Sequence, residues 1–459
     1  MTAAHSEWKP QDGGGAAESN GARNDYWRRD FRLLLSGSVF SQLGTLGAAA
    51  ANPLLALALT GSPIVAGWVA AASTLPGLFL HLPVGMIVDR FDRWRIMLVS
   101  QMFRVVNSIV LVIALVALDE PWFFLLLAAV IDGSCAVFFR IAELAAVRYV
   151  VPDGEAESAL GKSEARHHLA LVLGRPVGGI LFATGRTLPY LLDALTSFVS
   201  VISLLVLKGR RKSLDTQHKR TLNISKSRVL RSFLEGVRWI YRDRFLSVSL
   251  GACAIANTGF QIVILLLVVE AERRQLSGSI IGTMLATSGV SGFLGALTAP
   301  AMVRRFSPMA TVRYCFVLWI PFLLVVALVS NPLIGMFAWG SCSFMGAYIN
   351  VALAMHQGRH IPRGVLGRVE GVSQFLTTGA VTLGAFAGGY VIAALGTRPT
   401  AILVTGAFIV IGFAVPALVR EPRLSRKSGP AAEEAAQSAP ATDERVRLAG
   451  VAVPVGGDS

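Results

Sequence analysis

Charged residues are scarce in this chain: only 15% of its 459 residues are Asp, Glu, Lys or Arg. A soluble domain usually carries about 25%. Apolar residues make up 53% of the chain, and the mean hydropathy is +0.59. This composition argues against a water-soluble enzyme and favours a protein embedded in a membrane.

Cysteine is rare as well, and its placement excludes the sites that it commonly builds. Four cysteines lie in apolar stretches without a short-range pair or a neighbouring histidine cluster: Cys135, Cys253, Cys315 and Cys342. We expect buried thiols rather than a disulfide framework or a zinc site. The sequence also lacks a metal-binding set of His, Asp and Glu, a phosphate-binding loop and a nucleophile–base constellation. It therefore predicts no metal, no cofactor and no enzyme.

Acidic residues are outnumbered by basic ones, 28 to 42, which gives a formal net charge of +14. Such an excess suits a nucleic-acid partner only if it lies on a surface that faces water. Where the charge lies depends on the apolar segments of the chain.

Long apolar runs are what the sequence has in abundance. A helix needs about 20 mostly apolar residues to cross a bilayer, and twelve segments approach that length. They cover residues 31–58, 64–88, 95–117, 122–147, 160–184, 188–207, 246–269, 279–302, 310–330, 332–356, 367–394 and 399–419. We therefore expect an all-α membrane protein with twelve transmembrane helices.

One connection is far longer than the others and divides the twelve segments into two sets of six. The predicted order is a disordered tail over 1–24, a six-helix half over 25–207, a basic linker over 208–245, a second six-helix half over 246–420 and a disordered tail over 421–459. Arginines alternate with apolar residues between 229 and 245, which predicts an amphipathic helix at the membrane surface. The N-terminus has no short apolar core with a cleavage site, so no signal peptide is expected.

The Lys and Arg residues set the expected orientation. They gather on the side that holds both termini, at residues 23–32, 90–95, 208–245, 304–313 and 359–368. Because cytoplasmic loops carry an excess of Lys and Arg, we predict that both termini are cytoplasmic, in a bacterial inner membrane. The charge of +14 then forms a cytoplasmic collar, and no nucleic-acid partner is expected. His356 and His360, near this surface, are expected to be solvated.

The two halves repeat weakly but in register. Val151-Pro152 recurs as Ile361-Pro362, and Gly178-Gly179 recurs as Gly388-Gly389, both at an offset of 210 residues. The matches predict two pseudo-symmetric six-helix halves. Such repeats build many secondary transporters, which bind substrate near the membrane midplane where the repeats meet.

The connection between the second and third segments carries the motif that points to a family. It reads Gly85-Met-Ile-Val-Asp89-Arg90-Phe-Asp92-Arg93-Trp-Arg95 and resembles the G-x-x-x-D-R-x-G-R-[RK] loop of the major facilitator superfamily. The resemblance implies a cytoplasmic gate loop that breaks and re-forms as the halves rock, built by Gly85, Asp89, Arg90, Arg93 and Arg95. Gly85 would let two helices meet closely, and Asp89 would cap a helix or pair with an arginine. Asp92 stands where the family has its second glycine. The alternative is that these arginines only follow the positive-inside rule.

Further stretches between about residues 30 and 420 look like the bacterial branch that holds macrolide-efflux proteins and the enterobactin exporter: Leu59–Pro63, Leu82-Pro83, Asp193–Phe198 and Leu366–Val369. In the fifth segment, a turn with Gly174, Pro176, Gly178 and Gly179 resembles the G-P-x-x-G-G motif of export antiporters, with Arg175 at the motif's proline. Many drug/proton antiporters of the superfamily carry an arginine early in the fourth segment, where this chain has Ala129.

Ionisable groups inside apolar segments are costly unless paired or hydrated, which makes each a functional candidate. Arg104 lies in the third segment, and Asp132, Arg140 and Glu143 lie in the fourth. Asp132 is the first candidate for proton or cation coupling, and the equal alternative is a packing carboxylate paired with Arg104. Arg140 and Glu143 lie near the cytoplasmic end, where we expect a gate pair. Asp193 is expected to have a structural role.

Polar and aromatic side chains in the segments expected to line a central cavity are candidates for substrate contact. They are Gln42, Asn52, Asn257, Gln261, Trp339, Tyr348 and Asn350. An apolar and aromatic surface with few polar anchors suits bulky amphipathic molecules. The same residue types would serve equally well in helix packing.

The sequence and its resemblances together predict a secondary active efflux transporter, which exchanges protons for an amphipathic drug or secondary metabolite by alternating access. Its expected partners are a small-molecule substrate, protons and the lipid bilayer, and we expect a monomer. Two alternatives stand beside this prediction. One is an uptake or facilitative carrier for a small metabolite, and the other is a non-transporting membrane receptor or scaffold.

Overall fold

The structure is a computed structural model that describes residues 14–150, 170, 173–174, 177–210, 226–329 and 331–419. The first half contains helices α1 (Gly14–Thr60), α2 (Pro63–Arg90), α3 (Arg93–Ala117), α4 (Trp122–Val150) and α6 (Leu188–Arg210). Helix α7 (Lys226–Arg242) lies in the linker. The second half contains α8 (Arg244–Arg273), α9 (Gly278–Arg305), α10 (Pro308–Leu328), α11 (Pro332–His360), α12 (Arg363–Leu395) and α13 (Thr397–Leu418).

Ten helices in the described part of the chain are long and apolar enough to cross a membrane. They coincide with ten of the twelve predicted segments, and the prediction of an all-α membrane protein is confirmed. The segment predicted at 279–302 lies within α9. The segment predicted at 160–184 is described only in part, and its residues 177–184 are helical.

Several helix starts follow from a polar cap placed before a proline. Ser62, Ser307 and Asn331 each accept a hydrogen bond from a backbone N–H in the first turn of α2, α10 and α11. A proline follows each of these caps at the first helical position, where its missing N–H costs nothing and its fixed φ suits the helix. These short polar turns explain why the apolar length of each segment predicts the helices so closely.

The prediction of a disordered tail over residues 1–24 is wrong for its second part. Helix α1 begins at Gly14 and runs without a break into the apolar segment. Alanine and glutamate at the start of this stretch are strong helix formers, and they extend a helix whose nucleus the apolar segment already supplies. The tail predicted over 421–459 lies outside the described residues.

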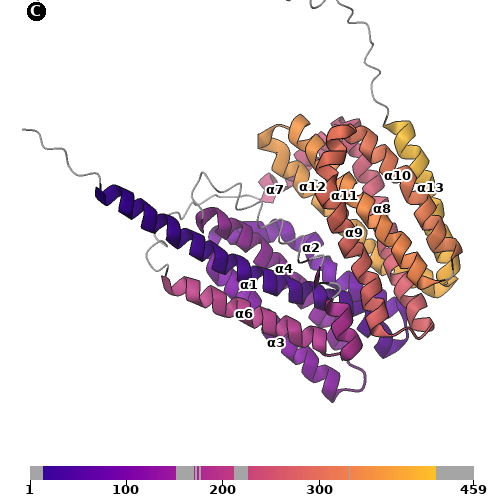
Figure 1. Ribbon diagram of the computed structural model, residues 1–459, viewed down its shortest axis with the longest axis horizontal. Coiled ribbons are helices and arrows are strands. Elements are labelled where there is room, and N and C mark those ends of the chain that lie inside the picture. The colour runs from indigo at the N-terminus through magenta and orange to yellow at the C-terminus, as the bar shows by residue number, and fades with distance from the viewer. Residues whose placement is uncertain are drawn as a thin grey trace, which may run out of the picture. The chain divides into compact units, whose positions relative to one another are not determined.

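The same four helix pairings recur in the two halves. In the first half, α6 contacts α1 and α3, and α4 contacts α2 and α3. In the second half, α13 contacts α8 and α10, and α11 contacts α9 and α10. Figure 1 shows α6 between α1 and α3, and α10 alongside α13. This correspondence confirms the predicted pseudo-symmetric halves.

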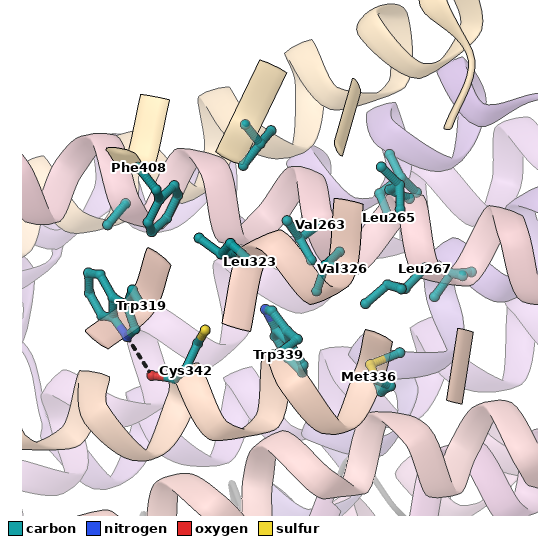
Figure 2. Close-up of a cluster of buried hydrophobic side chains, with 14 of the residues drawn as sticks. Val263, Leu265, Leu267, Trp319, Leu323, Val326, Met336, Trp339, Cys342 and Phe408 are labelled. Atoms are coloured by element: carbon teal, nitrogen blue, oxygen red, sulfur yellow. Dashed lines mark hydrogen bonds between the residues drawn. The ribbon is translucent and has the colours of Figure 1, made fainter. Parts of the chain in front are cut away.

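The core of the second half is apolar and rich in aromatic rings. Trp319, Phe316 and Phe408 are almost fully buried, and Trp319 donates from Nε1 to the carbonyl of Cys342 at 2.9 Å. Figure 2 shows Trp319 of α10 and Phe408 of α13 in one cluster with Val263 of α8 and Cys342 of α11. Apolar burial and edge-to-face ring packing therefore hold these four helices together.

Glycines allow the first helix of each half to meet another helix backbone to backbone. A Cβ added at Gly178 would overlap the carbonyl oxygen of Gly47 on α1. One added at Gly384 of α12 would lie 2.5 Å from the carbonyl oxygen and 2.8 Å from the Cα of Thr258 on α8. Small residues supply close packing in membranes, where water does not drive helices together.

Replacement of Gly384 by alanine tests this contact. We expect Gly384→Ala to lower the free energy of unfolding by about 1–3 kcal/mol, because the added methyl meets backbone that cannot move aside. Gly406→Ala on α13 is the matched control, since nothing lies within 4 Å of its added Cβ. Thermal unfolding of both purified variants in detergent measures the difference. Equal melting temperatures would contradict the close approach of α8 and α12.

Candidate functional site

A buried arginine in the first half holds two carboxylates. Arg104 on α3 is 2% exposed, and its Nε donates to Asp132 Oδ1 on α4 at 2.7 Å. Its Nη2 donates to Asp193 on α6, and its Nη1 donates to Ser41 on α1 at 2.8 Å. One guanidinium thus joins side chains from three other helices.

Two further side chains complete this charge cluster, which we define as Ser41, Gln101, Arg104, Ser108, Asp132 and Asp193. Gln101 donates from Nε2 to Ser41 Oγ at 2.7 Å, and Ser108 donates from Oγ to Asp193 Oδ2 at 2.7 Å. Both oxygens of Asp193 therefore accept hydrogen bonds, and that side chain is 1% exposed. The side chain of Asp132 is 18% exposed, which makes it the more accessible of the two carboxylates.

The charge cluster carries one positive and two negative formal charges. With both carboxylates ionised its net charge is −1, and one proton on either carboxyl brings it to zero. An uncompensated charge at membrane depth costs several kcal/mol, so the cluster is balanced only when it holds a proton or another cation. The pairing of Asp132 with Arg104, which was predicted as the alternative to a coupling role, is present. The coupling role of Asp132 stays a prediction. Asp193, expected to be structural, belongs to the same cluster.

A cavity of about 770 Å³ lies in the second half, between α8, α9, α11 and α12. Four of the residues predicted to contact substrate line it: Asn257, Gln261, Trp339 and Asn350. The sequence analysis missed other lining side chains, among them Phe260, Trp319, Glu370 and Gln374. Glu370 falls inside the predicted apolar segment at 367–394, so the rule that singled out Asp132 would have found it.

Three other residues predicted to line the cavity are bound to neighbouring helices or to their own. Asn52 donates to Ser73 Oγ at 3.2 Å and accepts from the Tyr190 hydroxyl at 3.0 Å, which ties α1 to α2 and α6. The hydroxyl of Tyr348 lies 2.9 Å from Thr298 Oγ1 on α9, and Gln42 lies within hydrogen-bonding distance of Ser38 on the same helix. The first two side chains therefore fasten helices together.

The predicted gate loop forms a tight turn between α2 and α3. Asp92 caps α3, accepting from the N–H of Trp94 at 2.9 Å, and it pairs with Arg95 at 3.4 Å. Asp89 lies within α2 and does not cap α3. Its side chain is outside the described part of the structure, so its pairing with an arginine stays a prediction. Asp92 thus has the capping role, which explains a carboxylate where the family has glycine.

The expected close approach at Gly85 is absent from this state. No described heavy atom outside its own helix segment lies within 4 Å of a Cβ added there. Arg90 is exposed and Arg93 is half-buried. In the described part of the structure, Gly85 therefore makes no close contact with a second helix.

The export-motif-like turn is a contact between helices. Gly174 and Gly178 approach the backbone of α1 around Gly47, and Gly179 is buried. Pro176 lies outside the described residues. The glycines of this turn act through their lack of a side chain, as the resemblance implies.

The predicted gate pair lies toward the end of α4, where Glu143 is buried and Arg140 is half-buried. Both side chains take part in interactions. Their burial sets them apart from ordinary surface charges, and a role in gating stays a prediction.

The two halves meet along α2 and α12. Trp68 donates from Nε1 to the Tyr390 hydroxyl at 3.2 Å, and the hydroxyls of Thr74 and Thr382 lie 2.9 Å apart. A Cβ added at Gly67 would lie 2.6 Å from the carbonyl oxygen of Ala385. All three contacts lie between the beginning of α2 and the end of α12, so the halves are closed at that end.

The linker helix α7 is anchored at the opposite end of α12. A Cβ added at Gly236 would lie 2.6 Å from the carbonyl oxygen of Arg368, and the rings of Phe233 and Phe375 pack edge to face with centroids 5.5 Å apart. Glu235 also pairs with Arg368. The amphipathic helix predicted at 229–245 therefore exists, and its inner face binds α12.

A histidine–carboxylate pair joins the linker to α11. His356 Nε2 lies 2.6 Å from Asp243 Oδ2, and Asp243 caps α8 by accepting from the N–H of Leu246. Burial alone would raise the pKa of Asp243, but the hydrogen bonds from His356 and Leu246 outweigh it and lower that pKa. The prediction that His356 is solvated is wrong, because its side chain is buried against Phe245.

Comparisons with known proteins agree with this arrangement. The sequence profile of the family described as transmembrane secretion effector matches residues 25–448. The multidrug efflux pump Tap of Mycolicibacterium fortuitum is 25% identical over 417 residues, which cover 87% of this chain and 98% of that protein. The uncharacterised MFS-type transporter YkuC of Bacillus subtilis (strain 168) is 24% identical over 387 residues, which cover 77% of this chain and 85% of that protein.

Solved transporter structures share the fold. The nucleoside transporter NupG superposes with a TM-score of 0.63 at 15% identity, over 85% of this chain and 99% of that one. A bacterial homologue of the iron transporter ferroportin, in an inward-facing state, superposes with a TM-score of 0.61 at 17% identity, over 84% and 98%. At these identities the likeness establishes the fold alone.

Replacement of Arg104 tests how much the charge cluster contributes to the stability of the protein. We expect Arg104→Gln to lower the free energy of unfolding by about 3–5 kcal/mol, because the two carboxylates then lose the cation with which both are paired. The double variant Arg104→Gln/Asp193→Asn should recover part of this loss, since it removes one of the stranded charges. Thermal unfolding in detergent reads both effects. A double variant less stable than the single one would contradict the charge balance described above.

Proposed function

Because the chain belongs to the family of transmembrane secretion effectors and is a membrane transporter of the major facilitator type, we propose that it is a secondary active efflux transporter. It exports an amphipathic drug or secondary metabolite in exchange for protons. The observation that carries this proposal is the buried charge cluster, whose two carboxylates around one guanidinium form a site for a single proton.

Asp132 is the residue that takes up the proton. Both oxygens of Asp193 are engaged and that side chain is buried, whereas Asp132 keeps partial access to water. Protonation of Asp132 weakens its bond to Arg104 Nε, because a charge-assisted hydrogen bond becomes a weaker neutral one. Arg104 then remains paired with Asp193, and α4 is freed to shift against α3. A proton thus changes which helices the arginine holds.

Substrate binds in the cavity of the second half, between α8, α9, α11 and α12, and the halves rock while it is bound. The cavity of about 770 Å³ offers apolar, aromatic and amide surface, which suits an amphipathic compound. The similarity to Tap, a multidrug efflux pump, supports export as the direction of transport.

The orientation follows from the basic residues. With the termini in the cytoplasm, the beginning of α2 and the end of α12 face outward, so the contacts of Trp68 with Tyr390 and of Thr74 with Thr382 close the outer side. The cavity is then accessible from the cytoplasm. The protein lies in the bacterial inner membrane and acts as a monomer, with lipid around it and no nucleic-acid partner.

An uptake carrier is the second candidate, because nucleoside and peptide transporters share the fold. A receptor or scaffold that transports nothing is the third, and the linker helix would then bind its partner. Flux measurements distinguish the efflux transporter, the uptake carrier and the receptor.

Replacement of Asp132 tests proton coupling. In proteoliposomes with an imposed pH gradient, we expect the protein to move an amphipathic compound against its own gradient. Asp132→Asn should reduce this accumulation by about tenfold or more, because asparagine keeps a hydrogen-bond acceptor for Arg104 but cannot bind and release a proton as a carboxylate does. Exchange of labelled for unlabelled compound without a pH gradient should persist in the variant.

Glu120→Gln is the control for Asp132→Asn, since Glu120 lies in the exposed turn between α3 and α4. Wild-type flux that ignores the pH gradient would rule out proton coupling and favour a facilitative carrier. The absence of flux for a broad panel of compounds would favour the receptor.

A disulfide between α2 and α12 tests alternating access. Thr74→Cys and Thr382→Cys, introduced together into a chain whose four native cysteines are replaced by alanine, should form a cross-link, because the two native hydroxyls lie 2.9 Å apart. We expect oxidation to abolish flux and reduction to restore it, since the halves cannot open on that side while linked. Each single-cysteine chain serves as its control. Full flux through the cross-linked protein would exclude the rocking motion.

A further inference from the structure

The cavity in the second half carries charge of one sign. Among its described lining residues, Glu370 on α12 is the one with a full charge at neutral pH. The other polar lining groups in this part of the chain are neutral amides and hydroxyls, and none of them belongs to Lys, Arg or His. Glu370 is exposed, so a cationic ligand that enters the cavity can reach its carboxylate.

Aromatic rings form another part of the wall. Phe260 on α8, Trp319 on α10 and Trp339 on α11 all line the cavity. The indole N–H of Trp319 is bound to the carbonyl of Cys342, and Phe260 meets Trp319 edge to face with centroids 4.9 Å apart. The bond from Trp319 to Cys342, drawn as a dashed line in Figure 2, and the contact with Phe260 fix the ring plane of Trp319 before a ligand enters. Aromatic faces attract organic cations through their quadrupoles.

We propose that this cavity binds an amphipathic organic cation, with the positive group at Glu370 and the apolar part against Phe260, Trp319 and Trp339. The inference rests on the proposed export function and restricts the substrate to compounds with a positive charge. Glu370 also has a contact within the protein, so the cation of the ligand shares or replaces that contact. A volume of about 770 Å³ accommodates a molecule of drug size.

The position of Glu370 links binding to the state of the transporter. Glu370, Gln374 and Thr377 line the cavity from α12, and their spacing of four and three residues places them on one face of that helix. The same helix makes the contact with α2 at Thr382. A cation that binds at Glu370 therefore acts on the helix that closes the two halves.

Two ions of the same shape and opposite charge test the inference: tetraphenylphosphonium and tetraphenylborate. We expect the purified full-length protein in detergent to bind the phosphonium about tenfold or more tightly than the borate. Glu370→Gln should weaken phosphonium binding by a similar factor and leave borate binding unchanged or stronger. Glu370→Asp should keep the preference, and Glu120→Gln should match the wild type. Protein-free micelles give the background for both ions.

Equal affinity of the wild type for the two ions would overturn the inference. So would a folded, monodisperse Glu370→Gln variant with wild-type phosphonium affinity. If that variant does not fold, Gln374→Lys is the second test, because it places an opposing charge on the same face of α12. It should lower phosphonium affinity and raise borate affinity, and any other result contradicts the proposal.

The binding measurement tests the cation site, and the flux measurement tests the export function, so each proposal can be contradicted without the other. Binding in detergent needs neither a gradient nor a closed membrane. A protein that prefers the phosphonium but moves no compound in proteoliposomes would sink the export function and leave the binding site standing. A protein that exports compounds with the pH gradient but binds both ions alike would do the reverse.

Discussion

The burial of one guanidinium is the constraint on which the first half depends. Arg104 costs several kcal/mol at membrane depth unless its donors find acceptors. Ser41, Asp132 and Asp193 provide them from α1, α4 and α6. Because lipid gives helices little apolar reason to associate, this polar joint specifies which helices meet and in what register. The arginine that many antiporters carry on the fourth segment is absent here, and Arg104 reaches the fourth segment from α3 instead.

The second half repeats the helix pairings of the first, but aromatic packing takes the place of hydrogen-bonded charges. Trp319, Phe316 and Phe408 fill the space between α10, α11 and α13 with rings, and no proton can change how rings pack. The two halves therefore contain different kinds of site. The first contains the charge cluster, and the second contains the cavity with its aromatic wall. A pseudo-symmetric fold has in this way acquired two unlike sites.

The sequence predicts segments well because apolar length and capped turns are local properties. It also singled out Arg104 and Asp132, since any charge inside an apolar run is conspicuous. It could not show that Asp193 shares the same arginine, because helical periodicity places residues on one helix and says nothing about the neighbouring one. Asn52 illustrates the same limit: its hydrogen bonds to Ser73 and from Tyr190 join three helices far apart in sequence. Glu370 was within reach of sequence reasoning and was overlooked among glycines and small polar residues.

A series of contacts through α2 connects α4, which carries Asp132, to α12, which carries Glu370. Gly133 follows Asp132 on α4, and a Cβ added there would overlap the backbone carbonyl of Ser73 on α2. The next residue along α2 is Thr74, which is bound to Thr382 on α12, the helix that carries Glu370. Because Gly133 has no side chain to yield, a shift of α4 at Asp132 meets the backbone of α2 at once. Release of Asp132 from Arg104 therefore acts on the contact that holds the halves closed, which is where a proton must act if it is to drive a molecule out of the other half.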